Sequence, residues 1–240
     1  MSSCGNRPNP PSTGTAPAVC STAPCPAGSG PAPGPPPRLD PEDEALIQCI
    51  LQLCRTDRDI VGRASRDLTL YSRRPKRIEL QGYEGGRWVT RRTVISGGTT
   101  RGTEVWINRG EDCAETKETV YHEVLHTMPR QQSMNSRDRE IDAYTRTAQW
   151  QIDRGVSGRF QTTNPDGTRS VDRAAIIRHV DGAYGYSSGE LRIVGRENGG
   201  RTVVLEDGTS RPAREGDQFQ YRPPQDLQER RLPPDRLRCP

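Results

Sequence analysis

The spacing of apolar residues predicts an amphipathic helix that begins after Asp40. Apolar side chains recur there every three or four positions: Ala45, Leu46, Cys49, Ile50 and Leu53. This period places them on one face of a helix, the face that packs against a core. Asp40 is a suitable N-cap, and the acidic residues 42–44 occupy the first turn, where the helix dipole favours negative charge.

Short strand-like segments follow this helix, at residues 77–80, 88–95 and 103–108. Glycine pairs at 85–86 and 97–98 separate them. Apolar and β-branched runs that alternate with glycine turns are typical of hairpins. We therefore predict a small antiparallel sheet in this part of the chain.

Three further helices are predicted, at residues 112–128, 136–153 and 171–180. Asp112 is a suitable N-cap for the first, and Pro129 ends it. Apolar residues of the second helix repeat at helical spacing and form a stripe: Ile141, Tyr144, Ala148 and Ile152. Strands separated from helices along the chain predict an α+β fold.

The last part of the chain changes to a β pattern. Residues 191–194 and 201–205 are β-prone, and Asn198-Gly199-Gly200 lies between them. An Asn-Gly sequence between two such runs is a strong hairpin signal. We expect the Pro- and Arg-rich tail from Pro223 onward to be loose.

Composition then divides the chain into three parts. Only 30% of the residues are hydrophobic and 5% aromatic, whereas Gly contributes 24 and Pro 21. Residues 1–38 are almost wholly Pro, Gly, Ala, Ser and Thr, and they cannot bury enough apolar surface to fold. We predict a disordered segment at 1–38, either a linker or a docking ligand. A zincin-like catalytic domain, argued below, would occupy 39–186, and a β-hairpin appendage with a loose tail 187–240.

Charge and hydropathy exclude two classes of partner. The formal net charge of +4 is too small to indicate nucleic acid binding, and the basic residues 73–77 are expected to form a solvated turn. No apolar stretch is long enough to cross a bilayer, and no basic segment followed by an apolar one marks a signal peptide. We expect no nucleic-acid or membrane partner. The protein would be exported by a specialised secretion system or else be cytoplasmic.

The seven cysteines indicate no metal site. They lie at positions 4, 20, 25, 49, 54, 113 and 239, without a Cys-x-x-Cys pair. An odd number leaves at least one thiol unpaired. Cys49 and Cys54 belong to the predicted apolar helix, where buried cysteines behave as small hydrophobic residues. The sequence leaves the redox compartment open.

The strongest chemical signal is the pair His122 and His126, two of only three histidines in the chain. Residues four apart lie on the same side of a helix, so both imidazoles can bind one Zn²⁺ ion. Glu123, one position round the helix, can reach a metal-activated water as a general base. Such a site needs a third protein ligand.

This pattern resembles the gluzincin metallopeptidases. His-Glu-Val-Leu-His is followed by a second predicted helix with Glu-Ile-Asp-Ala-Tyr, and gluzincins carry their third ligand as a Glu on a following helix. The resemblance implies Glu140 as the third zinc ligand and Ala143 as the small residue beside the first helix. Tyr144 stands where many members have an Asp that orients a ligand His. Asp142 is the alternative ligand.

The resemblance also implies the remaining parts of an active site. The connection after Pro129 is short, which favours antiparallel neighbouring helices. The segment 103–108 would be the edge strand offered to an extended substrate. A donor to the oxyanion is expected from the stretch that contains His179, Tyr184 and Tyr186, with His179 and Tyr186 favoured.

We therefore predict a zinc metallopeptidase, a hydrolase that resembles secreted bacterial toxin or effector peptidases. Its expected partners are a protein or peptide substrate, a delivery machine and an immunity or inhibitor protein. A zinc amidase that acts on cell-wall peptide is an alternative within the enzymes. A non-catalytic binding module with structural zinc is the alternative from another class, and Glu123 separates the two, because structural zinc has no use for that carboxylate.

Overall fold

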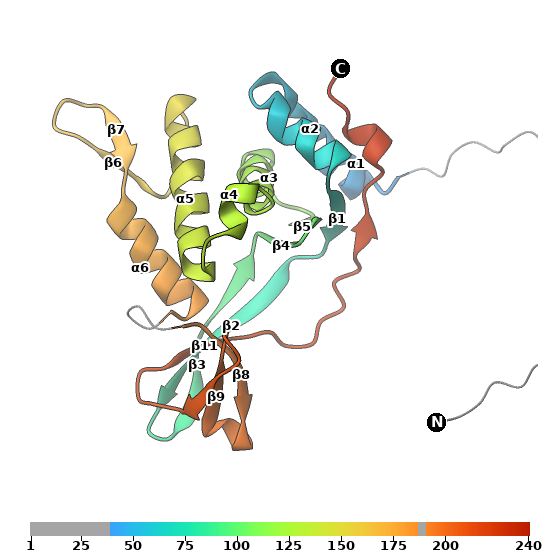
Figure 1. The fold of residues 1–240 in the computed structure, drawn as a ribbon. Helices are drawn as coiled ribbons and strands as arrows, with labels where there is room; N and C mark the ends of the chain where they lie inside the picture. The colour runs from blue at the N-terminus through green and yellow to red at the C-terminus, as the bar shows by residue number, and fades with distance from the viewer. Residues whose placement is uncertain (1–38, 187–190) are drawn as a thin grey trace, which may run out of the picture. The chain divides into compact units, whose positions relative to one another are not determined.

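Helices and strands both contribute to the described residues, 39–186 and 191–240 of the computed structural model (Figure 1). The α-helices are α1 (Pro41–Gln52), α2 (Arg58–Arg66), α3 (Cys113–His126), α4 (Pro129–Gln132), α5 (Ser136–Asp153) and α6 (Arg173–Tyr184). The described residues belong to one unit, Leu39–Pro240. The predicted disorder of residues 1–38 lies outside the described residues.

The strands form four small sheets. They are β1 (Thr69–Arg73), β2 (Lys76–Glu84), β3 (Arg87–Ser96), β4 (Gly98–Arg101), β5 (Glu104–Asn108), β6 (Gln161–Thr163), β7 (Arg169–Val171), β8 (Ile193–Glu197), β9 (Thr202–Leu205), β10 (Ser210–Pro212), β11 (Gln218–Tyr221) and β12 (Arg230–Arg231). Their orders are β12-β1-β5-β4, β11-β2-β3, β10-β9-β8 and β6-β7. The predicted α+β class is confirmed.

Helix capping follows the sequence signals. The Asp112 carboxylate accepts hydrogen bonds from the first backbone amides of α3, and Asn135 caps α5 in the same way. Helix α6 continues four residues beyond the predicted end at 180. It stops only where Gly185 adopts a left-handed conformation with φ 76°.

The sheet that carries β5 differs from the prediction. β1 runs parallel to β5, and β4 pairs with β5 in the antiparallel direction. The segment 103–108 is therefore an interior strand, and the expectation that it forms the edge is wrong. The edge position beside it belongs to β4, because the chain turns back at Gly102, where φ is 61°.

Two apolar clusters support the helices. The larger one joins α1, α2, α3, β1 and β5 through fully buried side chains such as Ile50, Val61, Val105 and Val124. The smaller one joins α5 and α6, through Ile141, Ile176 and Val180 among others. Helix α3 packs on α5, so the His-bearing helix lies where the two clusters adjoin.

The segment after Pro223 is ordered, contrary to the prediction of a loose tail. β12 pairs with β1, and Leu232 and Leu237 are buried in the larger cluster. The apolar positions of this tail are too widely spaced to show a period, so their burial depends on non-local contacts. The predicted hairpin around Asn198–Gly200 is present as β8 and β9.

Two disulfides connect distant parts of the chain. Cys49 pairs with Cys113, and Cys54 pairs with Cys239. The Cα–Cα distances of 5.3 and 5.5 Å lie within the usual range. The interpretation of Cys49 and Cys54 as free buried thiols is wrong, because α1 faces both α3 and the C-terminal tail. The remaining cysteines lie outside the described residues.

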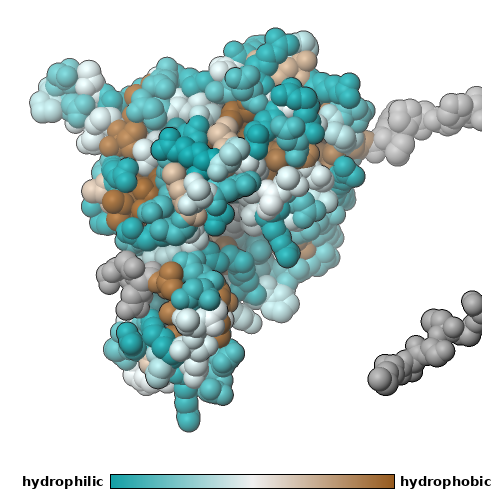
Figure 2. All heavy atoms as spheres, viewed as in Figure 1, coloured by the Kyte–Doolittle hydropathy of each residue, from teal (hydrophilic) through white to brown (hydrophobic). Residues whose placement is uncertain are grey.

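The face seen in Figure 2 is mainly hydrophilic, with apolar side chains in scattered patches. Large apolar side chains that are exposed in the described part of the chain are Ile95, Val156, Leu191 and Val194. Within the described residues, no helix combines the length and the apolar character that crossing a bilayer requires.

Candidate metal centre

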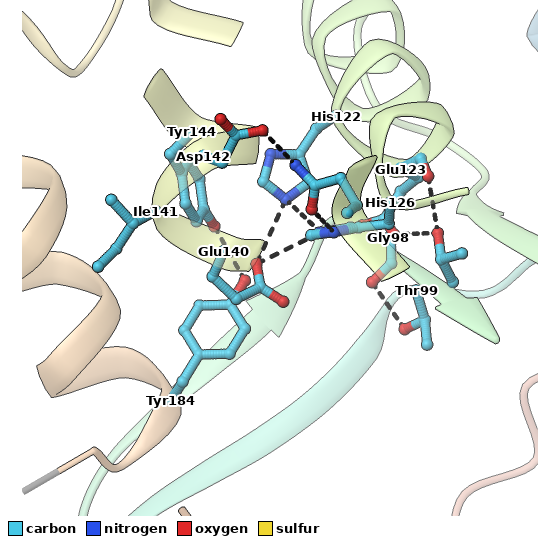
Figure 3. Close-up of polar contacts among 12 residues, drawn as sticks. Gly98, Thr99, His122, Glu123, His126, Glu140, Ile141, Asp142, Tyr144 and Tyr184 are labelled. Atoms are coloured by element: carbon cyan, nitrogen blue, oxygen red, sulfur yellow. Dashed lines mark hydrogen bonds and ion pairs between the residues drawn. The ribbon is translucent and has the colours of Figure 1, made fainter. Parts of the chain in front are cut away.

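Helices α3 and α5 bring His122, His126 and Glu140 together, as predicted (Figure 3). The Nε2 atoms of the two imidazoles are 3.1 Å apart. Glu140 Oε2 lies 3.5 Å from Nε2 of His122 and 3.4 Å from Nε2 of His126. The three ligand atoms lie within 4.8 Å of one another, which fits a single metal ion.

The convergence follows from the local sequence. His122 and His126 are four residues apart on α3, so their rings lie on the same side of the helix. Helix α3 ends at His126, Pro129 begins the single turn α4, and the chain then enters α5. Ala143 is fully buried on α5, one turn after Glu140, and α5 packs on α3. The short connection therefore sets the carboxylate opposite the two imidazoles.

In the metal-free protein, the charges of the three groups strongly shift the pKa values of His126 and Glu140. Burial alone would lower the pKa of His126, but the Glu140 carboxylate outweighs it and raises that pKa to about 9. Burial alone would raise the pKa of Glu140, yet His126 and His122 hold it well below its usual range. Glu140 Oε2 is buried without a close hydrogen-bond donor. A cation between the three groups would satisfy it.

Gln131 on α4 orients His126, a role that the sequence did not indicate. Its side chain is fully buried, and its Oε1 lies 3.3 Å from Nδ1 of His126. Its Nε2 donates to Asp142 Oδ2 at 2.6 Å, which turns the amide oxygen toward the histidine. An acceptor at Nδ1 places the imidazole proton there and leaves Nε2 free to bind a metal.

Asp142, the alternative metal ligand, lies outside the ligand group. Its carboxylate accepts the hydrogen bond from Gln131 and lies within ion-pair distance of Arg130 and Arg146. It follows Glu140 by two residues, so it projects from a different side of α5. Its contribution to the centre is indirect, because it fixes Gln131.

Glu123 lies beside the ligands and is only 7% exposed. Its Oε2 accepts a hydrogen bond of 2.6 Å from the Thr100 hydroxyl on β4. The strand approaches so closely that a Cβ atom at Gly98 would lie 2.5 Å from Glu123 Cγ. The edge strand and the carboxylate therefore form one side of the centre.

An aromatic group forms another side. The ring centroids of Tyr144 and His122 are 4.4 Å apart, and the Tyr144 hydroxyl lies 3.3 Å from Nε2 of His179. Burial raises the pKa of Tyr144, while burial and then Arg159 lower the pKa of His179 to about 4. Both side chains are therefore neutral near pH 7. His179 contacts Tyr144, and Tyr144 contacts the ligand histidine.

Of the two tyrosines after His179, Tyr184 is the one that lies beside the ligand group. Its hydroxyl is 3.1 Å from that of Tyr144, and its ring lies beside Glu140 (Figure 3). The Tyr186 hydroxyl instead contacts Ser136 Oγ at the start of α5. The difference arises because α6 continues to Tyr184, whereas Tyr186 follows the turn at Gly185.

Comparisons with protein-family models, with curated proteins and with solved structures gave no match. The likeness to gluzincins stays a prediction that rests on the residues themselves.

Proposed function

We propose that this protein is a zinc-dependent metallopeptidase whose metal is held by His122, His126 and Glu140. The observation that carries the proposal is the position of Glu123. This carboxylate is buried beside the ligand group, is held by Thr100, and is not one of the three ligands. A purely structural zinc would leave such a carboxylate without a role.

The chemistry follows from the positions of the side chains. A zinc ion bound here would acidify a water molecule and polarise a carbonyl group. Glu123 would act as the general base that takes a proton from the attacking water and gives it to the leaving nitrogen. The Thr100 hydroxyl donates to Oε2 of Glu123, which fixes the position of that carboxylate before substrate binds.

Neutral hydrogen-bond donors are available for the oxyanion. Tyr144, Tyr184 and His179 are connected by contacts of 3.1 and 3.3 Å next to the ligand His122. Phenols with raised pKa values keep their protons near pH 7 and can donate them to a developing negative charge. We assign the donor to this group, and Tyr186 is the weaker candidate because its hydroxyl contacts Ser136 instead.

The edge strand β4 supports a peptide as substrate. Its partner β5 covers one side, and β4 has no second partner strand among the described residues. An extended peptide could pair with that edge and pass in front of Glu123. The backbone of a peptide would then reach the base without any rearrangement of the sheet.

The two disulfides support a location outside the reducing cytoplasm. Disulfides persist in oxidising compartments and are rare in the cytosol. This favours the exported alternative from the sequence, a secreted effector or toxin peptidase.

The proposal is tested by metal content and turnover together. We expect about one zinc per chain in the purified protein, and loss of that zinc in the His122→Ala, His126→Ala double variant. Glu123→Gln should keep the zinc and lose turnover of a mixed peptide pool by at least about a hundredfold. Normal turnover by Glu123→Gln would contradict the peptidase function and leave the structural-zinc module.

A further inference from the structure

The hairpin of β2 and β3 has a face that adjoins the candidate active site. Lys76 lies directly opposite Ser96 in the register, and Leu80 lies opposite Arg92. Directly opposed residues share one face of a sheet, and so do residues two apart. Lys76 and Arg92 therefore lie on one face of the hairpin. β3 continues through Gly97 into β4, the strand beside Glu123.

Two further arginines, Arg192 and Arg222, lie near the start of α5 and the end of α6. Gln220 on β11 donates to the carbonyl of Ala183 at 2.5 Å, which places Arg222, two residues later, near Tyr184. The carbonyl of Arg192 accepts from the backbone amide of Glu206. The Glu206 side chain in turn hydrogen-bonds Ser136, the first residue of α5.

Arg159 reaches the same region through aromatic contacts. Its guanidinium carbon lies 5.1 Å from the ring centroid of Phe160. The Phe160 ring lies 5.2 Å from both His179 and Tyr144. After burial, the charges of Arg159 and Arg92 are the main causes that lower the pKa of His179, which agrees with their proximity.

These five side chains form a basic cluster: Lys76, Arg92, Arg159, Arg192 and Arg222. Within residues 39–186 and 191–240, none of them has a carboxylate at ion-pair distance, whereas nearby arginines do, as in Arg91–Glu84 and Arg137–Asp181. Arg192 Nε is buried without a hydrogen-bond partner. Burial lowers the pKa of Arg222, and the neighbouring charge of Arg192 lowers it further.

Positive groups that lie near one another and form no ion pair among the described residues favour an anionic ligand. We propose that the basic cluster binds carboxylates of the substrate, so that the enzyme selects peptides with Asp or Glu near the scissile bond. Guanidinium groups match the geometry of a carboxylate and can bind it through two hydrogen bonds. This inference rests on the proposed peptidase function, because it assigns a preference to that same site.

The test measures binding separately from hydrolysis. The zinc-loaded Glu123→Gln protein is titrated with two fluorescent peptide pools, identical except that Asp and Glu in one are Asn and Gln in the other. We expect the acidic pool to bind about tenfold more tightly at low salt, with a smaller difference at high salt. Adding Arg192→Gln and Arg222→Gln should remove the difference. Adding Arg55→Gln, an exposed change on the helical turn after α1, should leave it intact.

C-terminally amidated copies of both pools identify the source of the carboxylate. Both pools carry the same chain terminus, so a preference for the acidic pool that persists after amidation assigns the binding to side-chain carboxylates. Pools that bind alike and that both lose affinity on amidation would assign it to the terminus and overturn the selection of Asp and Glu. Equal binding of both pools overturns the whole inference. Hydrolysis of the pools by the parent protein is scored independently. Cleavage of both pools at the same rate would support the proposed peptidase function and contradict the selectivity for acidic peptides. Selective binding without any cleavage would support the selectivity and contradict the peptidase function.

Discussion

At the scale of single residues, the centre depends on one amide that orients a ligand. Gln131 accepts from His126 and donates to Asp142, so replacing it frees the imidazole to rotate and to change tautomer. We expect Gln131→Leu to weaken zinc binding by about 10- to 100-fold, measured by competition with a chelator.

The matched control is Gln149→Leu on α5, an exposed glutamine whose side-chain amide donates to Asp153 four residues later. It should bind zinc like the parent protein. Equal zinc affinities for Gln131→Leu and Gln149→Leu would show that Gln131 only fills space. Circular dichroism of both variants would confirm that α3 and α5 remain folded.

The proton on His126 predicts how zinc binding depends on pH. Its pKa without metal is raised to about 9, so the ring is protonated in neutral solution, and a metal must displace that proton. The apparent affinity should therefore rise with pH by up to about tenfold per unit between pH 6 and pH 8. A chelator competition series at fixed ionic strength measures this slope. An affinity that does not change over this interval would contradict the coupling of His126 to Glu140.

The sequence contained the ligands but not the residues that hold them. His122, His126, Glu123 and Glu140 belong to a pattern whose spacing carries the chemistry, and helical periodicity places them. Gln131 has no such signal, because its role depends on a single turn of helix between two predicted elements. The proposed donor group was predicted only in part, since the end of α6 decides which tyrosine faces Glu140.

At the scale of elements, the close contact between β4 and α3 leaves room only for glycine at position 98, beside the proposed base Glu123. A Cβ atom there would overlap the Glu123 side chain, and backbone and carboxylate would have to move apart. Gly98→Ala should therefore keep zinc and lower turnover by about a hundredfold, because small displacements of a catalytic group cost that much. The measurement is kcat for the peptide pool beside zinc content.

Gly182→Ala is the matched control for that glycine change. Gly182 lies in α6, and a Cβ atom at this position would have no neighbouring atom within 4 Å, so alanine fits. Its higher helix propensity should stabilise the fold by roughly 0.5 to 1 kcal/mol, with unchanged turnover. If Gly98→Ala also behaves as the parent protein, β4 does not position Glu123.

Local patterns predicted helices better than strand partners. Caps and apolar periods marked α1, α3 and α5 within a few residues. β1 was not predicted, and its parallel pairing with β5 joins segments more than thirty positions apart. No local signal specifies such a partner. The sequence therefore could not show that β4, and not β5, forms the edge of this sheet.

At the scale of the whole molecule, the C-terminal tail holds together parts that lie far apart in the chain. β11 pairs with β2 and β12 with β1, so residues after 217 complete two sheets begun before residue 85. Such pairings require the chain to close long loops, which composition and periodicity do not reveal. This explains why the tail was predicted to be loose although its apolar residues belong to the core.

Removing the disulfide between Cys54 and Cys239 should lower the stability of the fold strongly and leave zinc binding and turnover nearly unchanged. It closes a loop with a sequence separation of 185, and the chain-entropy estimate for that length is up to about 5 kcal/mol. It lies on the α1 side of the larger cluster, whereas the ligands lie between α3 and α5. We expect the Cys54→Ser, Cys239→Ser variant to melt about 10 °C or more below the parent protein. Its zinc content and its turnover well below that melting temperature should be unchanged.

Scanning calorimetry of both proteins with and without a thiol reductant separates the two bridges, because any further fall in the melting temperature of the variant reports Cys49–Cys113. Equal melting temperatures of parent and variant would mean that strand pairing and the buried leucines hold the tail without the bridge.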